Sequence, residues 1–139
     1  MPIARASREL LAPPEDVWTF LAEPRHLADW WPGIGAVEPD RRGLAEGARW
    51  RVRRRESSLF RRAQADDTLL VAVADRPRHF AFELVQSRLR VDLALVPHSG
   101  GRSKAALAVE GPFLLAFSRG LPKTALTRLH DLCQTAATV

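Results

Sequence analysis

The stretch LAPPEDVWTFLAEPRHLADWWPGI, residues 11–34, decides the fold of this 139-residue chain. The proline pair at 13–14, with two acids directly after it, is typical of a helix start, where proline has no hydrogen bond to lose and the helix dipole favours negative charge. Pro24 ends this helix and opens a second one over residues 25–31, which the Pro-Gly pair at 32–33 closes. The pattern therefore predicts two consecutive short helices.

The second predicted helix ends in two adjacent tryptophans, Trp30 and Trp31. Neighbouring helical positions point about 100° apart, so the two rings cannot share one buried stripe. Burying a ring of this size removes roughly 150–250 Å² from water, which makes an exposed second ring costly. We therefore expect Trp30 to pack on the core and Trp31 to face another apolar surface, of which a ligand cavity is one candidate.

Between residues 33 and 110 the apolar residues recur at every second position, which is typical of half-buried strands. In RWRVRRR, residues 49–55, the side chains of Trp50, Val52 and Arg54 share one side and four other arginines share the opposite side. Together with residues 3–10, the predicted strands are 33–39, 49–55, 68–75, 79–86, 89–96 and 103–110. One apolar face and one solvated face are typical of an antiparallel sheet.

The C-terminal part of the chain, residues 111–139, is helical again after a break at Gly111-Pro112. An apolar stripe runs along it at spacings of three and four: Leu114, Phe117, Leu121, Ala125, Leu129, Leu132 and Ala136. Gly120 and Pro122 interrupt this stripe, so we expect a kink or a break near Arg119. A single helix about 10 Å wide cannot fill the concave face of a six- or seven-stranded sheet, so the remaining space is the expected ligand cavity.

Composition indicates a single globular domain, with 46% hydrophobic and 27% charged residues. No apolar run approaches the roughly 18 residues of a membrane-spanning helix, and the N-terminus lacks an apolar segment of signal-peptide length. Cys133 is the single cysteine, which excludes an internal disulfide and is typical of a small core residue. We therefore expect a cytoplasmic protein of bacterial type; the sequence has no signature of an oligomeric state.

The charge is concentrated in one segment, residues 41–62, which we call the basic segment. It contains nine arginines and two glutamates, a local balance of +7 in a chain whose net charge is +5. Such a segment is typical of a solvated strand face that discourages edge pairing. Contact with a nucleic acid or the ribosome is the alternative reading.

The block APPEDVWTFLAEPRHLADWWPG, residues 12–33, followed by GLAEGARWRVRRR at 43–55 and a C-terminal helix after VEGP at 109–112, resembles the START-like, or SRPBCC, superfamily. Its branch of polyketide cyclases/dehydrases and lipid-transport proteins is the most similar. The resemblance covers nearly the whole chain and implies one START-like domain over residues 1–139.

The fold implied by this resemblance is the α+β helix-grip fold. In it, a curved antiparallel sheet of six to seven strands wraps around a long C-terminal helix, and two short helices follow the first strand. The resemblance also implies a hydrophobic cavity between sheet and helix. Trp30 would cap one end of the core, and Trp31-Pro32-Gly33 would contribute to the cavity wall or rim.

No catalytic constellation and no metal site is predicted, because the four histidines lack metal-ligand spacing and no serine lies in a nucleophile motif. Arg54 is in phase with the apolar residues of its strand, so it either points into the cavity, where it can bind a carboxylate or an enolate oxygen, or lies in solvent at the strand end. His79 and Glu83 would form an acid/base pair only if their side of the strand faced inward. The opposite side carries Phe80 and Phe82, and we expect that apolar side to be the inner one.

Three functions remain open at this stage. The first is a carrier or sensor of a small hydrophobic ligand such as a lipid, a quinone or a polyketide, with no cofactor. The second is a polyketide cyclase or dehydratase, against which the absence of tyrosine counts. The third is an RNA- or ribosome-associated protein that uses the basic segment. The expected cavity-lining residues are Trp30, Trp31, Trp50, Arg54, Phe80, Phe82, Leu93, Leu95, Phe113 and Phe117.

Overall fold

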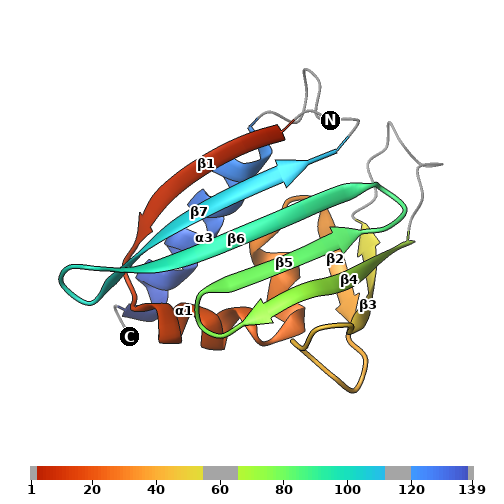
Figure 1. Cartoon of the computed structure of the whole chain (residues 1–139), viewed down its shortest axis with the longest axis horizontal. Helices are drawn as coiled ribbons and strands as arrows, with labels where there is room; N and C mark the ends of the chain where they lie inside the picture. Colours follow the sequence, from red (N-terminus) through yellow and green to blue (C-terminus); the bar gives the residue numbers. More distant parts are fainter. Residues whose placement is uncertain (1–2, 55–65, 112–119, 138–139) are drawn as a thin grey trace.

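A computed structural model describes residues 3–54, 66–111 and 120–137 of the chain (Figure 1). Its elements in chain order are β1 (Ile3–Leu10), α1 (Pro14–Leu21), the 3₁₀ turn η1 (Pro24–His26), α2 (Leu27–Trp30), β2 (Ile34–Glu38), β3 (Arg49–Arg54), β4 (Asp66–Asp75), β5 (His79–Leu84), β6 (Leu89–His98), β7 (Arg102–Glu110) and α3 (Leu121–Ala137). These elements confirm the predicted helix-grip architecture, including the two short helices after the first strand.

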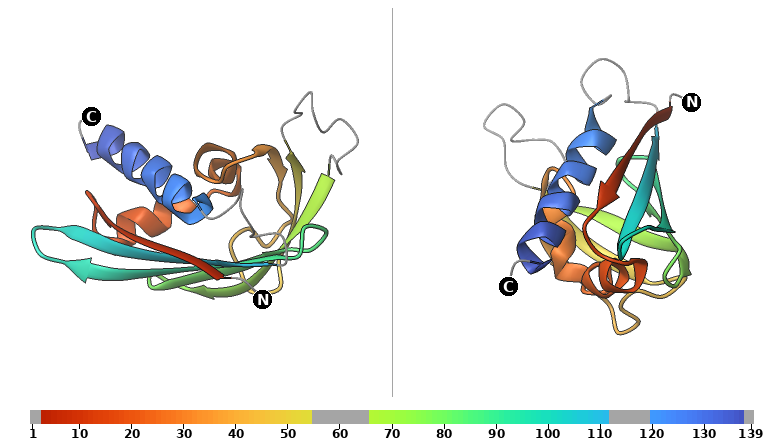
Figure 2. Two further views of the ribbon diagram at one scale, coloured as in Figure 1. Left: turned by 90° about the horizontal axis from the view of Figure 1, so that it is seen from above. Right: turned by 90° about the vertical axis from the view of Figure 1, so that its left-hand side faces the viewer.

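The strands of the described residues form one antiparallel sheet in the order β1-β7-β6-β5-β4-β3-β2. The sheet is curved, and the helices lie on its concave side (Figure 2). The period-two pattern has the predicted effect in β3, where Trp50 and Val52 are buried while Arg49, Arg51 and Arg53 are exposed. The same alternation buries the apolar residues of β5, β6 and β7 under the helices, among them Phe80, Phe82, Leu93 and Leu95.

The helical stretch after β1 follows its prolines, as predicted. Pro13 and Pro14 lie at the start of α1, and Pro24 lies at the first position of η1. The imidazole of His26, in η1, stacks on the ring of Phe20, in α1, at a centroid distance of 4.1 Å, and its Nδ1 lies 2.7 Å from the carbonyl oxygen of Phe20. This contact fixes the angle between α1 and η1.

The expectation that Trp30 and Trp31 cannot share one buried stripe, which assumed that both residues are helical, is wrong. Helix α2 ends at Trp30, and Trp31 has an extended backbone with φ −88° and ψ 122°, so the 100° rotation between helical neighbours does not apply to this pair. Both rings contact Phe82 edge to face, at centroid distances of 6.5 Å for Trp30 and 5.5 Å for Trp31. Their exposed fractions are 1% and 2%.

Helix α3 packs chiefly against β1, with further contacts to β7 and α2. It begins at Leu121, where Gly120 and Pro122 predicted an interruption; the expected stripe residues Leu114 and Phe117 lie outside the described residues. The buried side of the helix centres on Ala125, Leu126, Leu129 and Cys133. Among the described helices, none is long and apolar enough to cross a membrane.

Helix α3 covers the β1 side of the sheet. Over β5, the concave face is covered by aromatic side chains. The rings of Trp18 and Trp50 each lie 6.4 Å from the ring of Phe80, which lies 5.2 Å from that of Phe82. The indole Nε1 of Trp50 donates a hydrogen bond of 2.9 Å to the carbonyl oxygen of Gly43. This aromatic cluster occupies much of the space in which we expected the ligand cavity.

Candidate functional site

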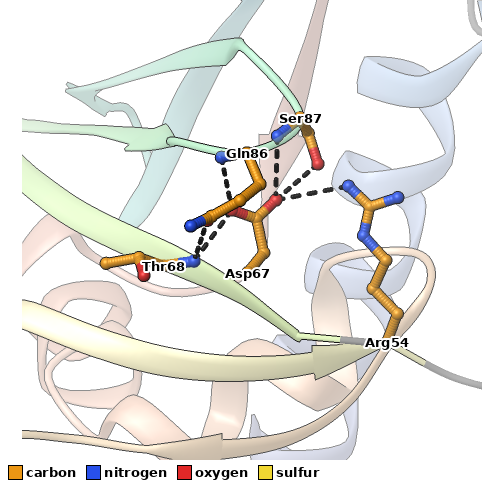
Figure 3. Close-up of polar contacts among 5 residues, drawn as sticks. All are labelled: Arg54, Asp67, Thr68, Gln86 and Ser87. Carbon is orange, nitrogen blue, oxygen red and sulfur yellow. Dashed lines mark hydrogen bonds and ion pairs between the residues drawn. The ribbon is translucent and has the colours of Figure 1, made fainter. Parts of the chain in front are cut away.

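A buried carboxylate, Asp67, organises the polar end of the concave face (Figure 3). Asp67 alternates with Leu69 and Val71 on the inward side of β4 and is only 2% exposed. A buried carboxylate is costly unless its oxygens are hydrogen-bonded. Its neighbours on β3, β4 and the turn after β5 supply those donors.

The Asp67 carboxylate accepts five hydrogen bonds. Oδ1 accepts from the backbone N–H groups of Thr68 and Gln86, each at 2.8 Å. Oδ2 accepts from the backbone N–H of Ser87 at 3.2 Å, from the Ser87 hydroxyl and from Nη2 of Arg54 at 3.3 Å. The carboxylate therefore ties β4 to the β5–β6 turn and fixes one side of the Arg54 guanidinium.

Arg54 is the last residue of β3, and its side chain is 36% exposed. The structure gives an arrangement between the two sequence alternatives, because Arg54 points toward the inner side but lies at the rim and pairs with Asp67. Its second terminal nitrogen points away from Asp67 (Figure 3). A guanidinium has five N–H donors, and one of them serves Asp67.

Arg54 borders a hollow of about 140 Å³ between the β5–β6 turn, the loop after α2 and the start of α3. Every other residue that lines it in the described part of the chain is apolar: Trp31, Pro32, Gly33, Ile34, Leu84, Leu89 and Leu121. We call this hollow, with Arg54 at its rim, the rim pocket. It combines an apolar wall with one cationic group, a combination typical of small-molecule sites.

Two of the expected cavity-lining residues, Trp31 and Arg54, meet in the rim pocket. Six others are buried in the core and do not line it: Trp30, Trp50, Phe80, Phe82, Leu93 and Leu95. Phe113 and Phe117 lie outside the described residues. Period-two alternation predicts which residues face inward, but it does not separate packed side chains from those that line a space.

Asp67 is the polar residue of this site that sequence reasoning missed. The predicted strand began at Thr68, because a charged residue is rarely assigned to the inside of a sheet. Its spacing of two and four positions from Leu69 and Val71 was the available signal, since strand residues at i, i+2 and i+4 share a face.

His79 and Glu83 lie on the outer side of β5, as the stronger claim of Phe80 and Phe82 to the inner side predicted. The Nε2 atom of His79 lies 2.7 Å from Oδ2 of Asp92 on the neighbouring strand, and the Glu83 side chain is exposed. They therefore form no acid/base pair facing the rim pocket.

The β3 arginines of the basic segment are divided between the two faces of the sheet. Arg51 and Arg53 point outward and share Asp66, at N–O distances of 3.9 and 3.5 Å, while Arg54 pairs with Asp67 on the other side. In the described ranges of the chain, no group of three or more His, Cys, Asp or Glu residues is arranged to hold a metal ion.

A second hollow, of about 170 Å³, lies between α1 and the C-terminal half of α3 and is lined by Phe20, Leu132 and Cys133 among others. Burial raises the pKa of the Cys133 thiol to about 11, so this sulfur is protonated at neutral pH. A larger hollow, of about 430 Å³, lies on the outer face of the sheet over β1, β6 and β7 and has a floor of alanines. Neither has a cation held against an apolar wall by a buried partner.

Comparison with solved structures identifies many proteins of the same fold at low sequence identity. A protein from Nitrosospira multiformis aligns with a TM-score of 0.73 and 11% identity over 99% of this chain and 100% of its own. The protein XoxI from Bacillus cereus aligns with a TM-score of 0.72 and 14% identity over 99% of both chains. The di-domain ARO/CYC BexL from the BE-7585A biosynthetic pathway aligns with a TM-score of 0.72 and 16% identity, over all of this chain and 48% of its own.

These likenesses establish the fold alone, and no protein of curated function matches the sequence significantly. The family assignment rests on the sequence itself. The family described as polyketide cyclase / dehydrase and lipid transport matches residues 1–132, which is nearly the whole chain and agrees with the resemblance noted above. The chain therefore belongs to the polyketide cyclase/dehydrase and lipid transport family.

Proposed function

We propose that this protein binds a small hydrophobic ligand in the rim pocket and acts as a carrier or sensor of that ligand. The observation that carries the proposal is the lining of the rim pocket, where, among the described residues, seven apolar residues and the cation Arg54 border the space. Such a wall offers water few hydrogen bonds, whereas an apolar group that binds there is stabilised by about 25 cal/mol for each Å² of its surface that it buries.

The size of the rim pocket limits what it can enclose. An engineered apolar cavity of about 150 Å³ in another protein holds benzene, so a space of about 140 Å³ suits a short alkyl segment or one aromatic ring, alone or as the inner ring of a fused pair. A lipid, quinone or polyketide would place one such part against Trp31 and leave the remainder outside the pocket.

A cyclase or dehydratase is the second candidate, and the description of the family favours it. Arg54 would be the group that stabilises an enolate oxygen of a polyketide substrate. Among the described residues that line the rim pocket, no side chain other than Arg54 is ionisable, so this reading needs the substrate or water to supply the proton transfers. A carrier needs no such group, and for this reason we place it first.

Native mass spectrometry of the purified protein, followed by organic extraction, tests the proposal. We expect a stoichiometric apolar passenger or, when the protein is purified free of ligand, saturable binding of 2-naphthalenemethanol. The variant L89W should abolish binding because its larger ring fills the rim pocket. V96W is the matched control, since Val96 lies on the same strand but is 56% exposed and does not line the rim pocket.

Binding that persists in a folded L89W, or no binding of passenger or probe at any concentration, would contradict a ligand site at this place. Turnover separates the carrier from the enzyme. A passenger recovered chemically unchanged favours the carrier, whereas a substrate and its cyclised product recovered together favour the cyclase.

A further inference from the structure

We infer that the ligand of the rim pocket carries a carboxylate, which Arg54 binds while Asp67 acts as a positioning residue. The inference rests on the proposed function and adds the chemical class of the ligand: an apolar carboxylic acid. Three features of the described residues support it, namely the orientation of the guanidinium, the saturation of Asp67 and the apolar surroundings.

Within the described ranges of the chain, the Arg54 guanidinium is hydrogen-bonded to Asp67 through one terminal nitrogen. Nη2 is held at 3.3 Å from Oδ2 of Asp67, and the other terminal nitrogen points away from this carboxylate (Figure 3). Arginine presents pairs of parallel N–H groups that match the two oxygens of a carboxylate. A guanidinium already fixed on one side loses less side-chain entropy when it binds a second partner.

The hydrogen bonds of Asp67 determine the charge that a ligand would meet. Its carboxylate accepts from three backbone N–H groups and the Ser87 hydroxyl in addition to Arg54, so its negative charge is shared among five donors. Asp67 also lies behind Arg54, is 2% exposed and does not line the rim pocket. A ligand in the rim pocket would therefore meet the guanidinium of Arg54 and not the carboxylate of Asp67.

The surroundings of Arg54 favour an anion over a neutral polar group. The other lining residues that the structure describes are apolar, and an apolar environment strengthens a charge-assisted hydrogen bond. An alcohol in the same place has one oxygen and no charge of its own, so it would form a weaker contact with the guanidinium than a carboxylate does. A planar carboxylate also fits the flat guanidinium edge, whereas an ammonium group would be repelled.

Two probes with the same ring separate the head group from the apolar part: 2-naphthoate and 2-naphthalenemethanol. We expect the wild-type protein to bind the acid roughly tenfold to a hundredfold more tightly than the alcohol, as measured by fluorescence titration at low salt. R54Q should lower the affinity for the acid far more than the affinity for the alcohol, and so remove this preference. R53Q is the matched control, because Arg53 carries the same charge one residue away but points outward and pairs with Asp66.

Two further variants test the role of Asp67 as a positioning residue. R54K keeps the charge but lacks the planar fork, so a preference of only a few fold should remain. D67N should reduce the acid-to-alcohol ratio while the alcohol still binds, since its amide repels the N–H groups that faced Oδ2. A purely structural role of Asp67 would lower both affinities together and leave the ratio unchanged.

The outcomes distinguish the inference from the function on which it rests. If both probes bind equally, or if R54Q and R53Q reduce acid binding to the same extent, the carboxylate inference is wrong and the hydrophobic site stands. If neither probe binds, the proposed function and the inference fail together.

Discussion

Asp67 and Arg54 form an ion pair whose two members lie in different environments. Asp67 is 2% exposed and accepts hydrogen bonds from three backbone N–H groups of β4 and the β5–β6 turn, whereas Arg54 is half-exposed at the end of β3. Removing a buried acceptor leaves its donors without partners, while an exposed cation can be replaced by water. The pair therefore contributes to stability mainly through the acid.

We predict that D67A lowers the free energy of unfolding by about 3–5 kcal/mol and that R54Q lowers it by at most about 1 kcal/mol. The reason is that D67A leaves the N–H groups of Gln86 and Ser87 without their acceptor, whereas R54Q keeps both of these hydrogen bonds. The N–H of Thr68 loses Asp67 but retains the side-chain oxygen of Gln86 at 2.8 Å. Urea unfolding of the two variants under identical conditions measures the difference. Equal losses would mean that Asp67 stabilises the fold through its ion pair with Arg54 and not through its hydrogen bonds to the turn.

At the residue scale, alternation singled out Arg54, but the sequence did not predict its partner Asp67. Alternation places both on the inner side of their strands, but a charged residue facing inward is expected only where a partner is known. The partner comes from a strand 13 positions away in the sequence, so neither residue predicts the other. The contact of the two strands is a property of the folded sheet.

At the scale of elements, the end of α2 determines how the Trp pair is used. The turn from helix to extended backbone at Trp31 places its ring against Phe82 and along the rim pocket. We predict that W31A lowers the free energy of unfolding by about 3–5 kcal/mol and also weakens binding of 2-naphthalenemethanol, whereas W31F retains most of both. Thermal melts and fluorescence titration provide the two measurements. Loss of stability with unchanged affinity would restrict Trp31 to the core.

The junction of β7 with the β5–β6 turn is close enough to require glycine at position 111. A Cβ added to Gly111 would lie 2.7 Å from Cδ2 of Leu89 and 2.9 Å from the carbonyl oxygen of Arg88. We predict that G111A lowers the free energy of unfolding by about 1–3 kcal/mol, because the turn must shift to admit the methyl group. Denaturant unfolding measures the loss.

Gly120 provides the control for this junction. A Cβ at Gly120 meets nothing within 4 Å, so G120A should be neutral or stabilise by up to about 1 kcal/mol. A G111A variant as stable as G120A would show that the turn has room to move.

The loop between β2 and β3 contains a carboxylate that responds to acid. The backbone N–H of Arg49, at 2.9 Å, and that of Arg42, also at 2.9 Å, hold the pKa of Asp40 below its usual 3.8, with the N–H of Arg49 as the largest cause. Because the pKa is lower in the folded state, this contribution to stability is complete above pH 3.8 and is lost as the pH falls through the lowered value.

We therefore predict that the Asp40 carboxyl titrates below pH 3.8 and that the amide shifts of Arg42 and Arg49 report the same midpoint by NMR. D40N should remove this step from the amide titrations and flatten the corresponding part of the stability profile. A midpoint at or above the usual value would mean that the loop opens in solution.

The elements themselves were predictable to a large extent, because each depends on local signals. Prolines 13, 24 and 32 set the helix boundaries, and alternation gave β3, β5, β6 and β7 with the correct inner faces. The start of β4 was placed two residues late because Asp66 and Asp67 interrupt the apolar pattern. The backbone at Trp31 was mispredicted because a short helix was extended by one residue at its end.

At the scale of the whole molecule, the volume of the ligand space was the least predictable quantity. The sheet curvature and a helix near one side of it follow from the pattern, but the filling of the remaining half depends on the orientations of large rings. The aromatic cluster of Trp18, Trp30, Trp50, Phe80 and Phe82 packs edge to face or tilted and leaves the rim pocket of about 140 Å³ beside it. Such packing depends on contacts between elements far apart in the sequence.

The basic segment tests whether the whole molecule also serves as a nucleic-acid binder. Acids pair with three of its six described arginines, since Asp66 lies beside Arg51 and Arg53, and Asp67 beside Arg54. RNA binding that neutralises phosphates weakens steeply with salt, with a log-log slope of about −0.7 for each phosphate contacted on a single strand. We expect weak binding of a single-stranded RNA with a slope no steeper than about −1.5, equivalent to roughly two phosphates. Fluorescence anisotropy across a salt series measures this slope.

The double variant R51E/R53E completes this test at the outward arginines, which are 68% and 70% exposed. If the segment is a solvated strand face, the variant changes RNA affinity little and leaves 2-naphthoate binding intact, because Arg54 and the rim pocket lie on the opposite side of the sheet. A steep salt slope that the double variant removes, with ligand binding unaffected, would instead assign the outer face to RNA. The two faces would then have separate partners, and the family fold would support both.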